Sequence, residues 1–122
     1  MQPLSEAPPL PLFAYGTLSD PLFTGRLLER RVASAPAVLL DHVLAEHPGQ
    51  GYSVAVPAPG RQAEGFLYRF LTAADYDRLD AYEGVGEGLY RRRRAEARPV
   101  VGGAAEPVFV YLPTDRAVRG YR

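Results

Sequence analysis

Short apolar or alternating stretches, separated by segments rich in glycine and proline, recur along most of the chain. Residues 64–70 alternate most cleanly, with Phe66, Tyr68 and Phe70 on one face of a predicted strand. A turn with the sequence Pro-Ala-Pro-Gly, at 57–60, is expected to stop the strand that precedes it. The other stretches whose pattern predicts strands are residues 10–15, 32–46, 52–56, 90–97 and 107–112.

Two further stretches have the spacing of helices. Ser19 or Asp20 can cap a helix that begins near Pro21, because proline suits the first helical position. The second predicted helix covers residues 72–83. Roughly six strands and two helices, without regular alternation between them, predict an α+β domain. We expect a small mixed, largely antiparallel β-barrel with flanking helices.

The helix over residues 72–83 opens with a Thr-x-x-Asp variant of the capping box and ends before Gly84. At about 100° per residue around the helix axis, the side chain of Glu83 points within roughly 20° of the direction of Tyr76. Leu79 points close to the same direction, on its other side. A carboxylate therefore lies on the apolar stripe, at a helix end where the macrodipole disfavours negative charge. Both effects raise the pKa of a carboxyl, as a general acid/base requires. The alternative is an acid at a frayed helix end that points to water.

The segment Tyr15-Gly16-Thr17-Leu18 joins a predicted strand to a predicted helix. Such a connection can leave successive backbone N–H groups unpaired and pointing together, which suits a carboxylate or an oxyanion. The alternative is an ordinary strand-to-helix turn.

Length and composition narrow the possible functions. The 122 residues suit one domain, expected over residues 10–122, after a disordered lead-in over residues 1–9. The formal net charge is zero and no stretch reaches the ~18 apolar residues of a membrane span, so neither a nucleic-acid nor a membrane partner is expected. Without cysteine there is no thiol nucleophile or thiolate metal site. We expect a cytoplasmic protein.

The remaining polar features are weaker signals. His42 and His47 have no adjoining acidic pattern, so no metal site is expected. The run of four arginines at 91–94 alternates between the two faces of its strand and cannot form one basic surface. A structural or peripheral role is expected for the run, with Glu96 or Asp80 as partners. The glycines at 84–88 follow a helix, whereas a dinucleotide fingerprint follows a strand.

Two segments together resemble the signatures of the gamma-glutamylcyclotransferase-like superfamily: Phe-Ala-Tyr-Gly-Thr-Leu at 13–18 and Leu-Asp-Ala-Tyr-Glu-Gly at 79–84. The chain is most similar to the short branch with the avirulence-induced plant proteins and small bacterial relatives. The resemblance covers residues 12–112. Its other matching pieces are Asp20-Pro21, residues 51–57, Glu64-Gly65, Tyr90-Arg91-Arg92 and Val110-Tyr111.

The resemblance implies a compact mixed barrel with a cavity, in which Glu83 is the catalytic acid/base for a small-molecule gamma-glutamyl substrate. The α-amino nitrogen of the substrate attacks its own γ-carbonyl, forming 5-oxoproline and releasing an amine or amino acid. Neither a cofactor nor a metal is implied. The residues implied to bind substrate are Tyr15, Gly16, Thr17 and Leu18, with Tyr90 and Tyr111 as further parts of the wall.

The sequence also departs from relatives. Gamma-glutamylamine enzymes usually carry lysine, glycine and asparagine after the first motif, where this chain has Ser19, Asp20 and Pro21. Ser53 stands where many short relatives have proline. The leaving group of the substrate therefore stays open. The alternative function is a non-catalytic small-ligand-binding domain that retains the cavity.

Overall fold

The computed structural model describes residues 9–46 and 53–115, and the predicted lead-in lies, apart from Pro9, outside the described residues. None of the helices in this part of the chain is long and apolar enough to cross a membrane. The elements follow in the order β1 (Leu12–Ala14), a 3₁₀ helix (Gly16–Ser19), α1 (Pro21–Leu28), β2 (Ala33–Glu46), β3 (Ser53–Arg69), α2 (Ala73–Tyr82), β4 (Tyr90–Pro99) and β5 (Glu106–Pro113).

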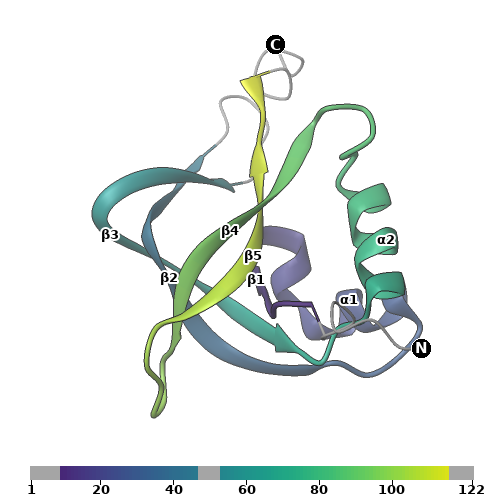
Figure 1. The fold of residues 1–122 in the computed structure, drawn as a ribbon, viewed down its shortest axis with the longest axis horizontal. Coiled ribbons are helices and arrows are strands. Elements are labelled where there is room, and N and C mark those ends of the chain that lie inside the picture. The colour runs from purple at the N-terminus through teal and green to yellow at the C-terminus, as the bar shows by residue number, and fades with distance from the viewer. Residues whose placement is uncertain (1–8, 47–52, 116–122) are drawn as a thin grey trace, which may run out of the picture.

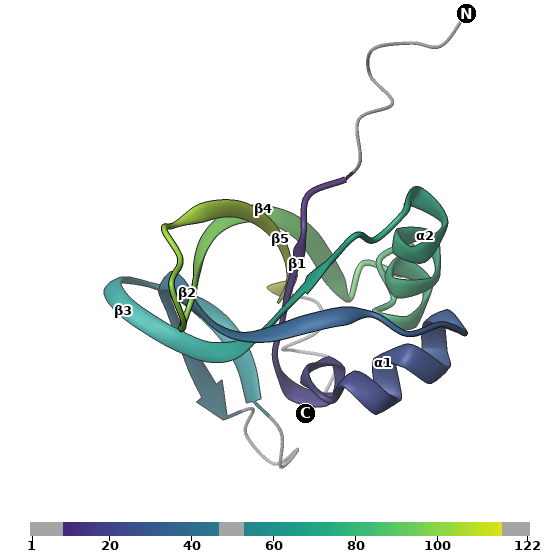
Figure 2. The same cartoon turned by 90° about the horizontal axis from the view of Figure 1, so that it is seen from below.

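The strands close into a barrel in the order β1-β3-β2-β4-β5. β1 pairs parallel with β5, and every other pairing is antiparallel. Figure 1 shows the curled strands on one side and both α-helices on the other. Figure 2 looks into the ring of strands and shows α1 and α2 together beside it. The predicted fold class, a small mixed and largely antiparallel barrel with flanking helices, is confirmed.

Alternation along the strands divides the core into two parts. Phe13 of β1 and Leu67 of β3 belong to a cluster made only of strand residues, which fills the barrel and is called the interior core here. Leu12 and Tyr68, their neighbours along the chain, face the helices instead and form the helix core with residues of α1 and α2. β1 is therefore buried on both faces, although it has only three residues.

The structure differs from the prediction at residues 57–60, where the turn was expected to end a strand. β3 continues through this segment from Ser53 to Arg69, so residues 9–46 and 53–115 contain five strands where six were predicted. Its pairing with β2 shifts register here, because the residues of β3 between Pro57 and Gln62 stand opposite Asp41 alone. Asp41 and Gly60 have φ of 60° and 79°, and the Gly60 N–H donates to Asp41 Oδ1 at 2.9 Å. The Pro and Gly residues thus bend the strand without ending it.

Phe70 also departs from its predicted place beside Tyr68. β3 ends at Arg69, and Phe70 has a φ of 63°, which turns its side chain away from the sheet. It is 76% exposed. The alternation of the sequence therefore extends one residue beyond the strand itself.

The helix starts follow the predicted signals. Asp20 caps α1 by accepting a hydrogen bond from the Leu22 N–H at 3.0 Å, with Pro21 at the first helical position. At α2, Thr72 and Asp75 form both hydrogen bonds of the capping box. These caps fix where each helix begins. The position at which α2 begins sets the direction in which the side chains at its C-terminal end point.

Candidate functional site

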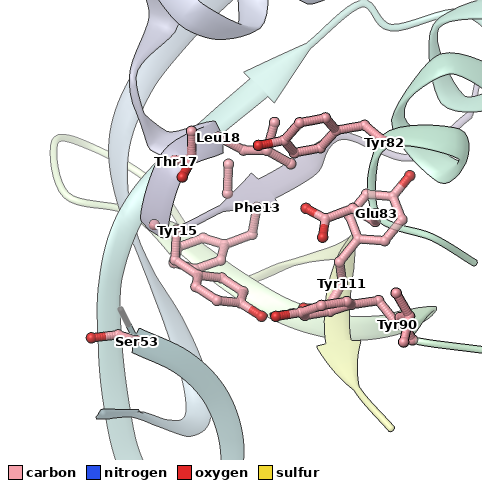
Figure 3. Close-up of a pocket in the computed structure, with 12 residues that line it drawn as sticks. Phe13, Tyr15, Thr17, Leu18, Ser53, Tyr82, Glu83, Tyr90 and Tyr111 are labelled. Carbon is pink, nitrogen blue, oxygen red and sulfur yellow. Dashed lines mark hydrogen bonds between the residues drawn. The ribbon is translucent and has the colours of Figure 1, made fainter. Parts of the chain in front are cut away.

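A cavity of about 370 Å³ opens between the loop after β1, the C-terminal end of α2 and the last two strands. Figure 3 shows side chains from all of these segments directed toward a common space. The residues that line the cavity are Phe13, Ala14, Tyr15, Gly16, Thr17, Leu18, Ser53, Tyr82, Glu83, Leu89, Tyr90 and Tyr111. All seven site residues predicted from the sequence are among them: Tyr15, Gly16, Thr17, Leu18, Glu83, Tyr90 and Tyr111.

The loop after β1 is fixed through one carbonyl group. The carbonyl oxygen of Leu18 accepts a hydrogen bond from Thr24 Oγ1 at 2.8 Å and another from the Tyr68 hydroxyl. Gly16 has a φ of +63°, the left-handed region that favours glycine. In a 3₁₀ helix each bond spans three residues, so the first two amides, of Gly16 and Thr17, have no partner within the helix. The Leu18 amide, at the third position, is used in the hydrogen bonding of the 3₁₀ helix itself.

Glu83 is the C-cap residue of α2, and its backbone N–H donates to the Leu79 carbonyl at 2.9 Å. Tyr76 and Leu79, which predicted the direction of Glu83, are buried in the helix core. The chain turns away directly afterwards at Gly84, whose φ is +69°. A Cβ at Gly84 would also lie 2.9 Å from Leu89 Cδ1. The turn leaves the Glu83 carboxyl directed into the cavity, as Figure 3 shows.

Burial raises the pKa of Glu83 from 4.5 to about 7. Desolvation disfavours the charged carboxylate, and no arginine, lysine or histidine is among the described residues that line this cavity to offset it. The predicted upward shift is confirmed, and its cause is burial. Near neutral pH both protonation states are well populated, so the same group can accept a proton and donate one.

Two tyrosines, the half-buried Tyr15 and the buried Tyr111, form a further part of the wall. The Tyr15 hydroxyl donates a hydrogen bond to the backbone oxygen of Tyr111. Burial raises the pKa of Tyr15 and of Tyr111 well above the ordinary value for a phenol. Both side chains therefore stay neutral at physiological pH and cannot act as bases. Each hydroxyl hydrogen already has a partner, since Tyr15 donates to Tyr111 and Tyr111 donates to Asp80 Oδ1. Glu83 is the lining carboxyl with a pKa near neutrality.

Asp80, the other carboxylate on this side of α2, is committed to structural partners. Its Oδ1 accepts a hydrogen bond from the Tyr111 hydroxyl at 2.6 Å, and its Oδ2 lies 3.6 Å from Arg92 Nη2. The Arg92 guanidinium in turn lies 4.5 Å from the ring centroid of Tyr76 and 4.9 Å from that of Phe109. The predicted pairing of the arginine run with Asp80 is thus confirmed for Arg92. Asp80 is not among the residues that line the cavity.

Five lining residues were not predicted as site residues: Phe13, Ala14, Ser53, Tyr82 and Leu89. Phe13 and Ala14 belong to the first motif, directly before Tyr15. Tyr82 stands directly before Glu83, so the motif that contains both could have suggested it. Leu89 is held near Glu83 by the turn at Gly84, whose carbonyl accepts a hydrogen bond from the Leu89 N–H at 3.0 Å. Ser53 reaches the cavity through the pairing of distant strands, which no local pattern encodes.

The described residues contain no group of three or more histidine, aspartate or glutamate side chains that could hold a metal ion. His42 instead hydrogen-bonds through Nδ1 to the Leu40 carbonyl at 2.8 Å. His47, the other histidine considered in the sequence, lies outside the described residues.

The raised pKa of Glu83 predicts that protein stability falls as the pH rises from about 4.5 to about 7. In that window the folded state holds a proton at Glu83 that the unfolded chain has released, so the free energy of unfolding decreases with pH. At 1.36 kcal/mol per pKa unit, the complete loss is on the order of 3 kcal/mol. The Glu83→Gln variant has no such proton. In urea unfolding, its free energy of unfolding minus that of the wild type should therefore be larger at pH 8 than at pH 5. An equal difference at both pH values would contradict the raised pKa.

The fold and the cavity together define a class: a small mixed barrel in which one half-buried carboxyl faces a tyrosine-lined space. The chain belongs to the family described as gamma-glutamyl cyclotransferase, AIG2-like, whose model matches residues 12–122. No curated protein sequence matches this chain significantly.

Solved structures agree with this fold. A protein from Arabidopsis thaliana, solved in solution, has a TM-score of 0.76 at 23% identity, with 88% of this chain and 70% of that chain covered. A structure called gamma-glutamyl cyclotransferase has a TM-score of 0.72 at 20% identity, with 86% of this chain and 66% of that chain covered. An AIG2-like protein from Mus musculus has a TM-score of 0.65 at 17% identity, covering 86% and 77%. At these identities the likeness concerns the fold.

Proposed function

We propose that the protein is a gamma-glutamyl cyclotransferase that converts a small gamma-glutamyl compound into 5-oxoproline and a free amine or amino acid. The observation that carries the proposal is the Glu83 carboxyl, which lies in the cavity with a pKa of about 7. Membership of the gamma-glutamyl cyclotransferase, AIG2-like family supports it. The proposed protein is cytoplasmic and uses neither a cofactor nor a nucleic-acid or membrane partner.

In the proposed reaction Glu83 moves one proton between two nitrogen atoms. As a carboxylate it takes a proton from the α-ammonium of the substrate, and the freed amine attacks the γ-carbonyl carbon. A C–N bond closes the five-membered ring, and the original amide C–N bond then breaks as Glu83 returns the proton to the leaving nitrogen. The ring nitrogen loses its second proton to solvent, which gives the neutral lactam, and the released amine takes up a proton from solvent. The nucleophile belongs to the substrate, and well-oriented intramolecular attack can have effective molarities of about 10⁵ M or more.

The rest of the cavity is proposed to hold and orient the substrate. The amides of Gly16 and Thr17 have no partner within the 3₁₀ helix and can donate to a carboxylate or to the oxyanion of the tetrahedral intermediate. Tyr15, Tyr90 and Tyr111 would close around the carbon chain of the glutamyl group. The described residues of the lining include no basic side chain, so the substrate ammonium is the proposed partner of the Glu83 carboxylate.

The test is a panel of gamma-glutamyl amines, gamma-glutamyl amino acids and gamma-glutamyl peptides, incubated with the purified protein while 5-oxoproline is measured. We expect release from at least one of them, with a rate that depends on the protonation of a group near pH 7. No release from any compound, together with measurable binding of one, would replace the enzyme with the non-catalytic ligand-binding domain.

A further inference from the structure

Tyr111, part of the wall of the cavity beside Glu83, is held at two points. Its hydroxyl donates a hydrogen bond to Asp80 Oδ1 at 2.6 Å, and its backbone oxygen accepts one from the Tyr15 hydroxyl. The residue is buried. The bond at its hydroxyl fixes how the ring stands in the wall, and the bond at its backbone links it to Tyr15. The orientation of the ring therefore depends on Asp80, which is not among the lining residues.

Asp80 is held in turn by Arg92 of β4. Its second carboxylate oxygen, Oδ2, lies 3.6 Å from Arg92 Nη2, and both side chains are half-buried. Arg92 and Tyr111 stand directly opposite each other in the pairing of β4 with β5, so their side chains share one face of the sheet. Asp80 meets both of them from α2. A charged acceptor makes a stronger hydrogen bond than a neutral one, so the ion pair supports the bond to the Tyr111 hydroxyl.

The Arg92 guanidinium has a fixed place of its own. It lies 4.5 Å from the ring centroid of Tyr76 and 4.9 Å from that of Phe109. These two rings pack edge to face, with their centroids 5.3 Å apart. A chain of contacts therefore runs from the helix core through Arg92 and Asp80 to Tyr111.

Other members of the arginine run are placed differently. Arg91 and Arg93 lie on the opposite face of β4, since the side chains of a strand alternate between its faces. Together with residues that include Ala55 and Leu112 they line a second cavity, which shares no described residue with the first. Within residues 9–46 and 53–115, neither of these two arginines forms an ion pair. Arg92 differs from them because an ion pair connects it, through Asp80, to the wall beside Glu83.

We propose that Arg92 and Asp80 are positioning residues. Arg92 holds Asp80, and Asp80 holds the Tyr111 hydroxyl, so that the tyrosine wall keeps the orientation in which it receives the substrate. The inference rests on the proposed function, because this wall is proposed to close around the carbon chain of the glutamyl group. Neither residue touches the substrate. The alternative is a network that only stabilises the packing of α2 on the sheet, and its loss would lower the stability without changing KM.

The test is a double-mutant cycle in which Arg92→Gln and Tyr111→Phe are made singly and together. The substrate is the compound of the gamma-glutamyl panel that is turned over fastest. Arg92→Gln should raise KM by about tenfold, less than the 10²-fold that a misplacement of about 1 Å can cost, with a smaller change in kcat. Tyr111→Phe keeps the ring but removes the hydroxyl through which Asp80 acts. In that background, adding Arg92→Gln should leave KM unchanged.

Stability separates the positioning role from the purely structural one. Arg92→Gln removes the contacts with Tyr76 and Phe109 in both backgrounds, so the free energy of unfolding in urea should fall in both. A loss of stability in both backgrounds, with a rise in KM only where the Tyr111 hydroxyl is present, is the expected result. A similar rise in KM in both backgrounds, or no rise in either, overturns the proposal.

Arg94→Gln is the matched control. Arg94 is exposed two residues further along the same face of β4, and it forms no ion pair within the described part of the chain. The variant should keep the wild-type KM. A rise in KM as large as that of Arg92→Gln would show a general effect of charge and would overturn the role of Arg92.

If the wild-type protein turns over none of the panel compounds, the same cycle is measured as dissociation constants for the panel compound that binds. Turnover with equal effects of Arg92→Gln in both backgrounds overturns the positioning role and leaves the proposed function standing. Binding without turnover, weakened by Arg92→Gln only where the Tyr111 hydroxyl is present, supports the positioning role and overturns the enzymatic function. Neither turnover nor binding of any panel compound overturns both.

Discussion

Replacing Glu83 with glutamine is expected to lower 5-oxoproline formation by about 10²–10⁴-fold, the usual contribution of a positioned acid/base group. Glutamine keeps the size of the side chain and part of its hydrogen bonding but cannot carry the titrating proton. The fold should survive, because burial already disfavours the charged form of this carboxyl. The measurement is kcat with saturating substrate across pH 5 to 9. The wild-type profile should change near pH 7, and this change should be absent from any residual activity of the variant.

Two further variants test whether the effect belongs to Glu83 in particular. Asp77→Asn removes an exposed negative charge from the same helix and should leave turnover unchanged. Asp80→Asn removes the rival carboxylate, which accepts the Tyr111 hydroxyl bond at 2.6 Å and lies outside the cavity lining. Its effect should be smaller than that of Glu83→Gln. If Asp80→Asn abolishes turnover while Glu83→Gln does not, Asp80 is the catalytic acid/base.

The direction of Glu83 could be predicted from the sequence because helices are specified locally. The capping box at Thr72 fixed the first turn of α2, and the 3.6-residue period then placed Glu83 near the direction of Tyr76. The prediction succeeded although Glu83 is the C-cap residue rather than part of the helix. The backbone hydrogen bond from Glu83 to Leu79 keeps this residue close to helical geometry.

Features that depend on pairing between distant strands could not be predicted in the same way. The Pro-Ala-Pro-Gly segment carries strong local turn signals, but β2 pairs on both sides of it and holds β3 as one strand. The alternation of Arg91 and Arg93 was visible in the sequence. Which face of β4 would meet a cavity depended on how the barrel closes, with Ala55 and Leu112 brought in from β3 and β5.

Gly65→Ala is expected to cause the second large effect, a loss of about 1–3 kcal/mol or more in the free energy of unfolding, the range typical of overpacked cores. A Cβ at Gly65 would lie 2.3 Å from the backbone oxygen of Ala14 and 2.6 Å from Phe13 Cζ. The Phe13 side chain is buried in the interior core and cannot swing into solvent. The Ala14 oxygen belongs to β1, whose three residues pair with β3 and whose Leu12 also pairs with Phe109 of β5.

Relief of the contact at Gly65 must therefore move β1, and β1 leads directly into Tyr15 and Gly16 of the cavity. Turnover should fall along with stability, because misplacement of a catalytic site by about 1 Å can cost 10²-fold in rate. Gly86→Ala is the matched control: a Cβ there meets no atom within 4 Å, and the stability should stay within about 0.5 kcal/mol of wild type. Urea unfolding of the three proteins at one pH measures the difference. A Gly65→Ala protein as stable as Gly86→Ala would show that β1 does not pack against β3 as closely as these distances require.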